Sequence, residues 1–214
     1  MHSDPKTLIK YSYNQLALKN LPCRYIFKDW KHIDKLLQNL PPGANILDIG
    51  CGDGMPISQY IVGKSFNLTG IDLSEKQIEL AKNNIPQGNF LTMDMENITL
   101  PEKSFDALVI FNSLFHVPRE YHQHLIKKFN SLLKNGGYLM MTLGLIEHES
   151  IDEEYEDIKL FKSQWGKEKN VQILIDSEFS LLYSENYKVG NLEQMLIFAK
   201  KISNDKRHTI YKDK

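Results

Sequence analysis

Short apolar runs alternate with amphipathic segments along most of the chain. The runs predicted to be strands cover residues 46–49, 66–71, 89–93, 105–111 and 138–143. The segments predicted to be helices cover residues 57–62, 74–84 and 118–135, the last with Gly136 or Gly137 as its C-terminal cap. Strands that alternate with helices at this spacing predict right-handed crossovers and a mainly parallel sheet.

The two ends of the chain follow other patterns. Apolar side chains recur at helical spacing through residues 5–40, which predicts an N-terminal helical segment. Residues 147–157 are acidic and poorly patterned, so we expect a loop or a weak helix there. Residues 179–189 and 194–201 predict two strands, in an antiparallel hairpin that closes the sheet.

Composition and charge narrow the class of protein. With 214 residues, 42% of them hydrophobic and 25% charged, the chain suits one globular domain with a substantial core. Its formal net charge of −1 provides no basic field, which argues against a nucleic-acid partner. Two cysteines are too few for a disulfide framework, and no run suits a signal segment or a membrane span. We therefore expect a reduced, cytoplasmic protein without a membrane partner.

The first predicted strand runs into a turn, Gly50–Gly54, with glycine at its first, third and fifth positions. A dinucleotide-binding turn would place its third glycine where this chain has Met55. Asp48 and Asp53 flank the turn, whereas a pyrophosphate requires bare amides with no facing acid. A ligand with a sulfonium and an amino group tolerates such carboxylates. The turn thus favours S-adenosylmethionine over a dinucleotide.

A carboxylate also ends the second predicted strand, at Asp72. A carboxylate in this place can accept hydrogen bonds from both ribose hydroxyls. The alternative is a helix N-cap, but Ser74 already provides the cap, with Gln77 three residues on. We favour the ribose role, with Leu73 packed against the adenine.

These features resemble the class I S-adenosylmethionine-dependent methyltransferases, whose first motif is an acidic residue followed by G-x-G-x-G. The other matching segments, in the family's order, are Gly70–Ser74, Asp94-Met95, Ser104–Asp106, Phe115–Pro118 and Leu133–Gly137. The resemblance spans roughly Tyr11 to Lys201 and is closest to the small-molecule methyltransferases. Residues 147–166, where the family builds its acceptor pocket, match no known substrate type.

The resemblance implies an α/β fold with a Rossmann-like, doubly wound, seven-stranded sheet, mostly parallel, with an antiparallel terminal hairpin. It also implies that the N-terminal helical segment is a lid over the cofactor. We therefore divide the chain into a lid segment at residues 1–40, a cofactor-binding methyltransferase domain at 41–201 and a flexible basic tail at 202–214.

The family also implies individual cofactor contacts. The acid that ends the third strand accepts the adenine amino group and the next residue offers its amide, which here are Asp94 and Met95; the alternative is a solvated acid beside a core methionine. An early tyrosine, here Tyr11, contacts the cofactor or substrate. Asn112 and Ser113 should face the sulfonium and its methyl group, because ligands bind at the carboxyl ends of parallel strands. The predicted cofactor-binding set is Tyr11, Asp48, Gly50, Cys51, Gly52, Asp72, Leu73, Asp94, Met95, Asn112 and Ser113.

His116 follows the fourth predicted strand, where cofactor and acceptor should meet. A neutral imidazole there can take a proton from a hydroxyl or amine acceptor, or it can be a structural or cofactor-contacting histidine. The candidate substrate contacts are Tyr13, His116, His148, Phe161 and Trp165. His148 lies between two glutamates, a mixture that does not favour one metal, so we expect no metal site.

The expected reaction moves a methyl group from S-adenosylmethionine to an oxygen or nitrogen of a small molecule and leaves S-adenosylhomocysteine. Base-modifying relatives carry Asn/Asp-Pro-Pro-aromatic after the fourth strand, and this chain has Asn112-Ser113-Leu114-Phe115 instead. Two alternatives remain: a methyltransferase acting on RNA or protein, and a non-catalytic protein that binds the cofactor. We expect a monomer or a homodimer.

Overall fold

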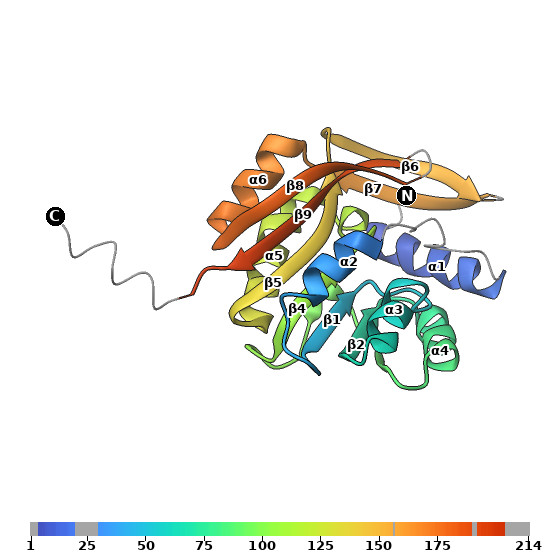
Figure 1. Ribbon diagram of the computed structural model, residues 1–214. Coiled ribbons are helices and arrows are strands. Elements are labelled where there is room, and N and C mark those ends of the chain that lie inside the picture. Colours follow the sequence, from blue (N-terminus) through green and yellow to red (C-terminus); the bar gives the residue numbers. More distant parts are fainter. Residues whose placement is uncertain (1–3, 20–29, 156, 190–191, 204–214) are drawn as a thin grey trace.

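The computed structural model of the protein describes residues 4–19, 30–155, 157–189 and 192–203 (Figure 1). Residues 1–3 and 20–29 of the predicted lid segment, Cys23 among them, lie outside the described residues, as does the predicted basic tail beyond residue 203. None of the helices in the described part of the chain has the length and apolar character needed to cross a bilayer.

A seven-stranded sheet forms the centre of the fold, in the order β3-β2-β1-β4-β5-β9-β8. Its strands are β1 (Asn45–Ile49), β2 (Asn67–Asp72), β3 (Asn89–Thr92), β4 (Phe105–Ile110), β5 (Leu133–Gly144), β8 (Phe179–Val189) and β9 (Leu192–Lys201). The first five strands pair in parallel, and β9 pairs antiparallel with both β5 and β8. The predicted doubly wound sheet with a closing hairpin is confirmed.

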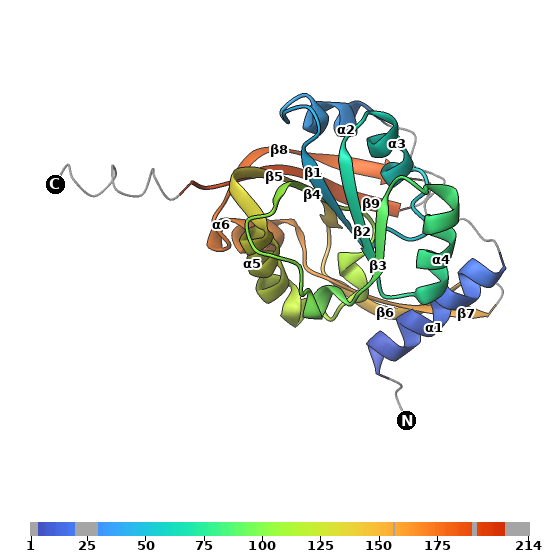
Figure 2. The ribbon, with the colours of Figure 1, turned by 90° about the horizontal axis from the view of Figure 1, so that it is seen from below.

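Helices cover both faces of this sheet (Figure 2). The helices are α1 (Pro5–Leu18), α2 (Trp30–Leu37), α3 (Ile57–Gly63), α4 (Glu75–Asn84), α5 (His122–Leu132) and α6 (Lys167–Asp176). Alternate strand residues serve opposite faces: Ile46 packs into the core beneath α2, α3 and α4, and Leu47 into the core beneath α5 and α6. Both faces of the central strands are thus buried, as the apolar runs require.

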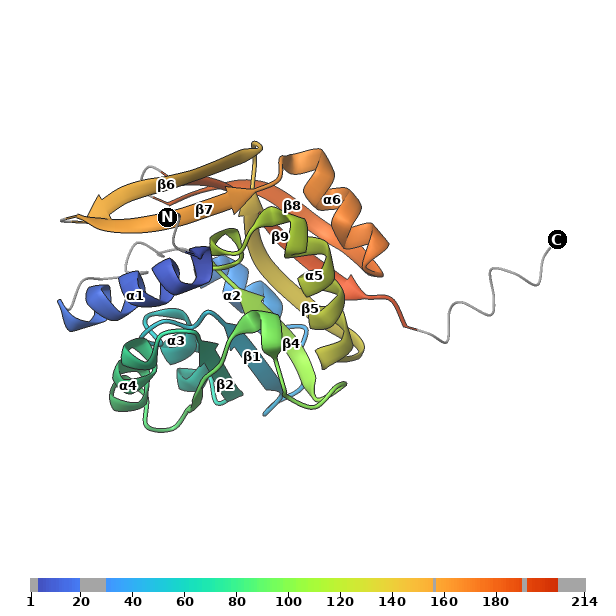
Figure 3. The same ribbon diagram turned by 180° about the vertical axis from the view of Figure 1, so that it is seen from behind.

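The prediction of a loop or a weak helix over residues 147–157 is wrong. Residues His148–Tyr155 form β6, which pairs antiparallel with β7 (Ile158–Gln164) in a separate two-stranded sheet. The hairpin lies beside α1 (Figure 3), where Leu160 and Phe161 pack against Ile9. The charged β6 has no apolar pattern of its own because β7 makes the hairpin's packing contacts with α1.

The predicted end of α5 is also wrong. The helix ends at Leu132, and Gly136 lies inside β5 rather than at a helix cap. The ammonium of Lys201 donates to the carbonyl of Asn130 at 2.7 Å and to that of Leu133 at 2.8 Å. Since this distant lysine binds carbonyls at the end of the helix, no glycine cap is needed.

Candidate active site

A cavity of about 760 Å³, its open mouth included, lies at the carboxyl ends of β1, β2, β3 and β4. The helix α1 closes part of it. The lining residues are Lys6, Ile9, Tyr13, Gly50, Gly52, Ile71, Asp72, Leu73, Met93, Asp94, Met95, Glu96, Asn112, Ser113, His116, Val117 and Pro118. The topology thus brings four separate strand ends to one place, as expected for a ligand site in an open α/β sheet.

The turn after β1 requires glycine at its first position. Gly50 has a φ of +71°, and a Cβ added there would lie 2.4 Å from Cβ of Ser113. The backbone N–H of Gly50 donates to the carbonyl of Ile71 at 2.8 Å, which ties the turn to β2. Gly54 serves packing instead, because a Cβ there would lie 2.6 Å from Cδ1 of Ile85.

Two predicted cofactor ligands lie behind this turn. Asp48 and Cys51 are fully buried, and neither lines the cavity. The hydroxyl of Ser58 donates to Oδ2 of Asp48 at 2.7 Å, which fixes the start of α3 against β1. The structure therefore places both side chains where they support the turn from within the core.

Asp72 connects the turn to α4. Its Oδ2 accepts from the backbone N–H of Gly52 at 2.9 Å, and its Oδ1 accepts from the N–H of Ser74 at 2.9 Å. The hydroxyl of Ser74 accepts from the N–H of Gln77, so the predicted cap of α4 is confirmed. Asp72 lines the cavity between the glycine turn and α4.

The end of β3 carries Asp94 and Met95, which both line the cavity. The ammonium of Lys6, on α1, lies 2.8 Å from Asp94 and 2.9 Å from Oε1 of Glu96. Partial burial lowers the pKa of Lys6, but hydrogen bonds to the two carboxylates outweigh it and raise the pKa well above its ordinary value. The sequence reasoning missed Lys6 and Glu96, because nothing local links residue 6 to the third strand.

The loop after β4 is held by its neighbours. Asn112 has a φ of +52°, and its N–H donates to Oγ1 of Thr142 on β5 at 3.0 Å. The hydroxyl of Ser113 donates to the carbonyl of Ile49 at 3.0 Å. These bonds place both predicted residues at the cavity wall, beside the glycine turn.

His116 links three segments that are far apart in the sequence. Its Nδ1 lies 2.7 Å from the carbonyl oxygen of Phe161 on β7, and its Nε2 lies 2.7 Å from the hydroxyl of Tyr13 on α1. Burial lowers the pKa of His116 from 6.5 to about 4, so the ring is neutral at neutral pH. Two predicted substrate contacts, Tyr13 and His116, therefore meet at the cavity wall, and Phe161 meets them through its backbone.

The remaining predicted contacts lie away from the cavity. Tyr11 is 63% exposed on the outer side of α1. His148 is exposed, with Nε2 at 2.9 Å from the hydroxyl of Ser150. The indole N–H of Trp165 donates to the carbonyl of Arg119 at 2.8 Å. Trp165 thus fixes the hairpin's exit rather than lining the cavity.

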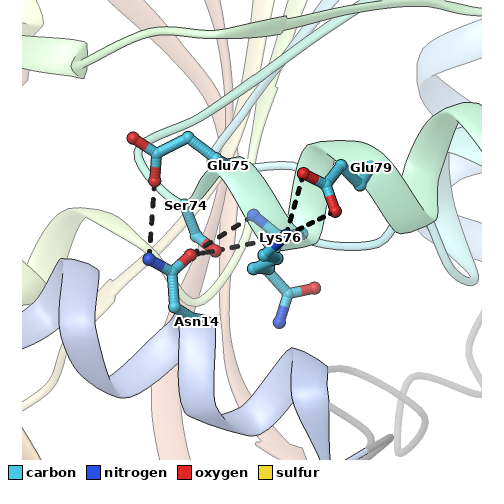
Figure 4. Close-up of polar contacts among 6 residues, drawn as sticks. Asn14, Ser74, Glu75, Lys76 and Glu79 are labelled. Atoms are coloured by element: carbon cyan, nitrogen blue, oxygen red, sulfur yellow. Dashed lines mark hydrogen bonds and ion pairs between the residues drawn. The ribbon is translucent and has the colours of Figure 1, made fainter.

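Polar contacts dock α1 on the start of α4 (Figure 4). The amide oxygen of Asn14 accepts from the hydroxyl of Ser74 at 2.6 Å and from the backbone N–H of Lys76 at 3.3 Å. Its amide nitrogen donates to Glu75, which also pairs with Lys10. Asn14 thus binds an N–H of the first turn of α4 from outside, and α1 is held next to the segment that carries Asp72.

Comparison with known proteins agrees with this architecture. Residues 46–137 match the family model described as a methyltransferase domain. Over 104 residues the chain is 35% identical to the ubiquinone biosynthesis O-methyltransferase of Coxiella burnetii, a match that covers 47% of this chain and 43% of that protein. The chain therefore spans less than half the length of this curated relative.

Two solved structures share the fold. An S-adenosylmethionine-dependent methyltransferase from Methanosarcina mazei has a TM-score of 0.73 at 21% identity and covers 83% of this chain and 100% of its own. Magnesium protoporphyrin IX methyltransferase from Synechocystis PCC 6803 has a TM-score of 0.71 at 19% identity, over 93% of this chain and 98% of its own. Residues 46–137 thus resemble a methyltransferase domain, and the chain shares the fold of these two S-adenosylmethionine-dependent methyltransferases.

Proposed function

We propose that the protein transfers a methyl group from S-adenosylmethionine to an oxygen or nitrogen of a small-molecule acceptor and releases S-adenosylhomocysteine. The observation that carries this proposal is the order of groups along the cavity. Acids follow β2 and β3, a glycine turn follows β1, and neutral polar residues follow β4. A nucleoside bearing a short cationic chain would match this order, with its base and ribose at the two acids and its chain at the glycine turn.

The lining supports a definite assignment of roles. Asp72 would hold the ribose, with Leu73 against the base, and Asp94 and the amide of Met95 would hold the adenine. Gly50 and Gly52, which line the cavity at the end of β1, suit the methionine portion. The cofactor supplies an electrophilic methyl group when bound; the protein's contribution is to align the acceptor with it and to exclude water.

The wall near Asn112, Ser113 and His116 would hold the transfer point. We also propose that α1 is part of a lid, because Lys6, Ile9 and Tyr13 close the cavity from above the strand ends. A cavity closed in this way favours a small acceptor over RNA or a protein surface. Tyr11, His148 and Trp165, which lie outside the cavity, remain weaker candidates for contacts.

Two measurements test the proposal. Calorimetry with S-adenosylhomocysteine should show binding at one site, and Asp72→Ala should weaken that binding strongly. Incubation of the protein with cell extract and S-adenosylmethionine labelled in its methyl group should then yield a labelled small molecule. Absence of binding would refute the cofactor assignment, and label found only in RNA or protein would refute the acceptor class. Binding without any transfer would indicate a non-catalytic protein.

A further inference from the structure

One face of α1 spans the mouth of the cavity. Lys6, Ile9 and Tyr13 recur at helical spacing on this helix, and all three line the cavity. Lys6 lies on the first turn, at the exit of β3, whereas Tyr13 lies two turns later, beside His116 after β4. The first turn of α1 therefore covers the end of the cavity that we assign to the base of the cofactor.

Lys6 joins this first turn to the exit of β3 by two ion contacts. Its ammonium lies 2.8 Å from Oδ2 of Asp94 and 2.9 Å from Oε1 of Glu96. The side chains of Asp94 and Glu96 are 20% and 24% exposed, so solvent screens these contacts less than it screens a fully exposed ion pair. All three groups belong to the protein, so the contacts can form with or without a ligand in the cavity.

The carboxylate of Asp94 is fixed by the same arrangement. Its Oδ1 accepts from the backbone N–H of Glu96 at 2.9 Å, and its Oδ2 accepts from Nδ2 of Asn97 at 3.1 Å as well as from Lys6. Asp94 is the acid that we propose to hold the adenine. The closing of α1 and the contact with the base therefore share one carboxylate.

The rest of α1 is held by other contacts. The hydroxyl of Ser12 donates to a backbone carbonyl of β7 at 2.6 Å, and Asn14 binds the start of α4. Ile9 packs against the same strand, β7. Breaking the Lys6 contacts therefore frees the first turn of α1, while the helix from Ile9 onward stays docked.

We propose that Lys6 gates the cavity: its ion contacts with Asp94 and Glu96 close the first turn of α1 over the nucleoside, and the cofactor and its product pass when these contacts break. The inference rests on the proposed methyltransferase function and concerns ligand exchange at that same site. A gate made only of protein groups resists entry and exit alike, so its loss speeds both. Loss of a residue that merely contacted the ligand would speed exit alone.

The test measures the association and dissociation rate constants of S-adenosylhomocysteine on the whole immobilised chain by surface plasmon resonance. In Lys6→Met we expect both constants to rise roughly tenfold, the effect of losing hydrogen bonds between charged groups. The dissociation constant, which is their ratio, should change less than threefold. Lys6→Arg keeps a cation that reaches both carboxylates, and its rate constants should stay within threefold of those of the unaltered protein.

Lys10→Met is the matched control, because it removes the same charge from the same helix. Lys10 pairs with Glu75 on α4 and does not line the cavity, so both rate constants should stay within twofold. Salt provides a second measurement that needs no variant. Raising sodium chloride from about 0.05 M to about 0.5 M should speed both association and dissociation in the unaltered protein, because it screens the ion contacts. S-adenosylhomocysteine has no net charge at neutral pH, and Lys6→Met should lack this response.

Three results would overturn the inference: unchanged rate constants in Lys6→Met, a rise in its dissociation rate constant alone, or an equal rise of both constants in Lys10→Met. A salt response that is absent from the unaltered protein, or that persists in Lys6→Met, would do the same. Failure of S-adenosylhomocysteine to bind the unaltered protein would instead refute the proposed function, so the two failures are distinguishable.

Discussion

Acid should destabilise this protein through His116 in a measurable way. The ring is buried and neutral in the folded state, where its pKa is about 4, whereas an exposed histidine has a pKa of 6.5. Between these values the unfolded chain binds one more proton than the folded protein. The free energy of unfolding therefore falls as the pH falls through this window, and the contribution is fully present above pH 6.5.

The size of the effect follows from the two pKa values. One pKa unit corresponds to about 1.4 kcal/mol, and integration over the window gives a loss of about 2 kcal/mol at pH 5 and about 3 kcal/mol at pH 4. This is a substantial part of the net stability of a domain, which is typically about 5–15 kcal/mol. Burial also lowers the pKa of His122, so the acid response of the whole protein has more than one source.

The comparison with His116→Gln isolates the effect. Glutamine can donate to Phe161 and accept from Tyr13 but does not titrate, and His122 is the same in both proteins. Urea unfolding followed by circular dichroism at pH 7, 6, 5 and 4 gives the difference in unfolding free energy between them. That difference should shift by about 3 kcal/mol in favour of the variant on going from pH 7 to pH 4. Parallel curves for the two proteins would refute a buried, neutral His116.

Three further substitutions have defined outcomes. Gly50→Ala combines a positive φ with a clash against Ser113 and should cost about 3 kcal/mol in urea unfolding, whereas Gly43→Ala, with a φ of +69° but no atom within 4 Å, should cost about 1 kcal/mol. Asp72→Ala should weaken calorimetric binding of S-adenosylhomocysteine at least thirtyfold, since it removes charged hydrogen bonds at the cavity wall. Asn14→Ala should speed amide hydrogen exchange in α1 roughly tenfold, because it removes the contacts with α4.

A specific result would contradict each of these three predictions. Equal losses in the two glycine variants would show that the clash at the turn is relieved at no cost. Asp176→Ala, which removes the same charge on α6, should leave binding unchanged, and an equal loss there would point to a general charge effect. Unchanged exchange in Asn14→Ala would mean that other contacts hold α1 in place.

The glycine turn and the acids after it were predictable from local sequence. Gly50, Asp72 and Asp94 each follow an apolar run at a fixed offset, and parallel strands bring their carboxyl ends to one edge. The place of each of these residues at the cavity could therefore be inferred from its position after its own strand. The cap at Ser74 was equally local, since it depends on residues three positions apart.

Other features depend on partners that the local pattern does not reveal. The charged segment of β6 predicts a loop or a weak helix, because only its pairing with β7 makes it a strand. The end of α5 was misplaced because Lys201, 71 residues beyond Asn130, binds its last turn. Lys6 was overlooked for the same reason, as its partners lie on the third strand's exit.

The sequence alone thus determined the sheet, the cofactor class and the strand ends at which the ligand should lie, since these follow from periodicity and from turns a few residues long. Only the tertiary structure decided how the cavity wall near the end of β4 is built. The Tyr13 hydroxyl and the His116 ring are 103 residues apart and the Phe161 carbonyl lies 45 residues further on, and they meet because α1 and the β6–β7 hairpin pack over the same strand end. Contacts across such separations arise from packing of whole elements, which no short stretch of sequence encodes.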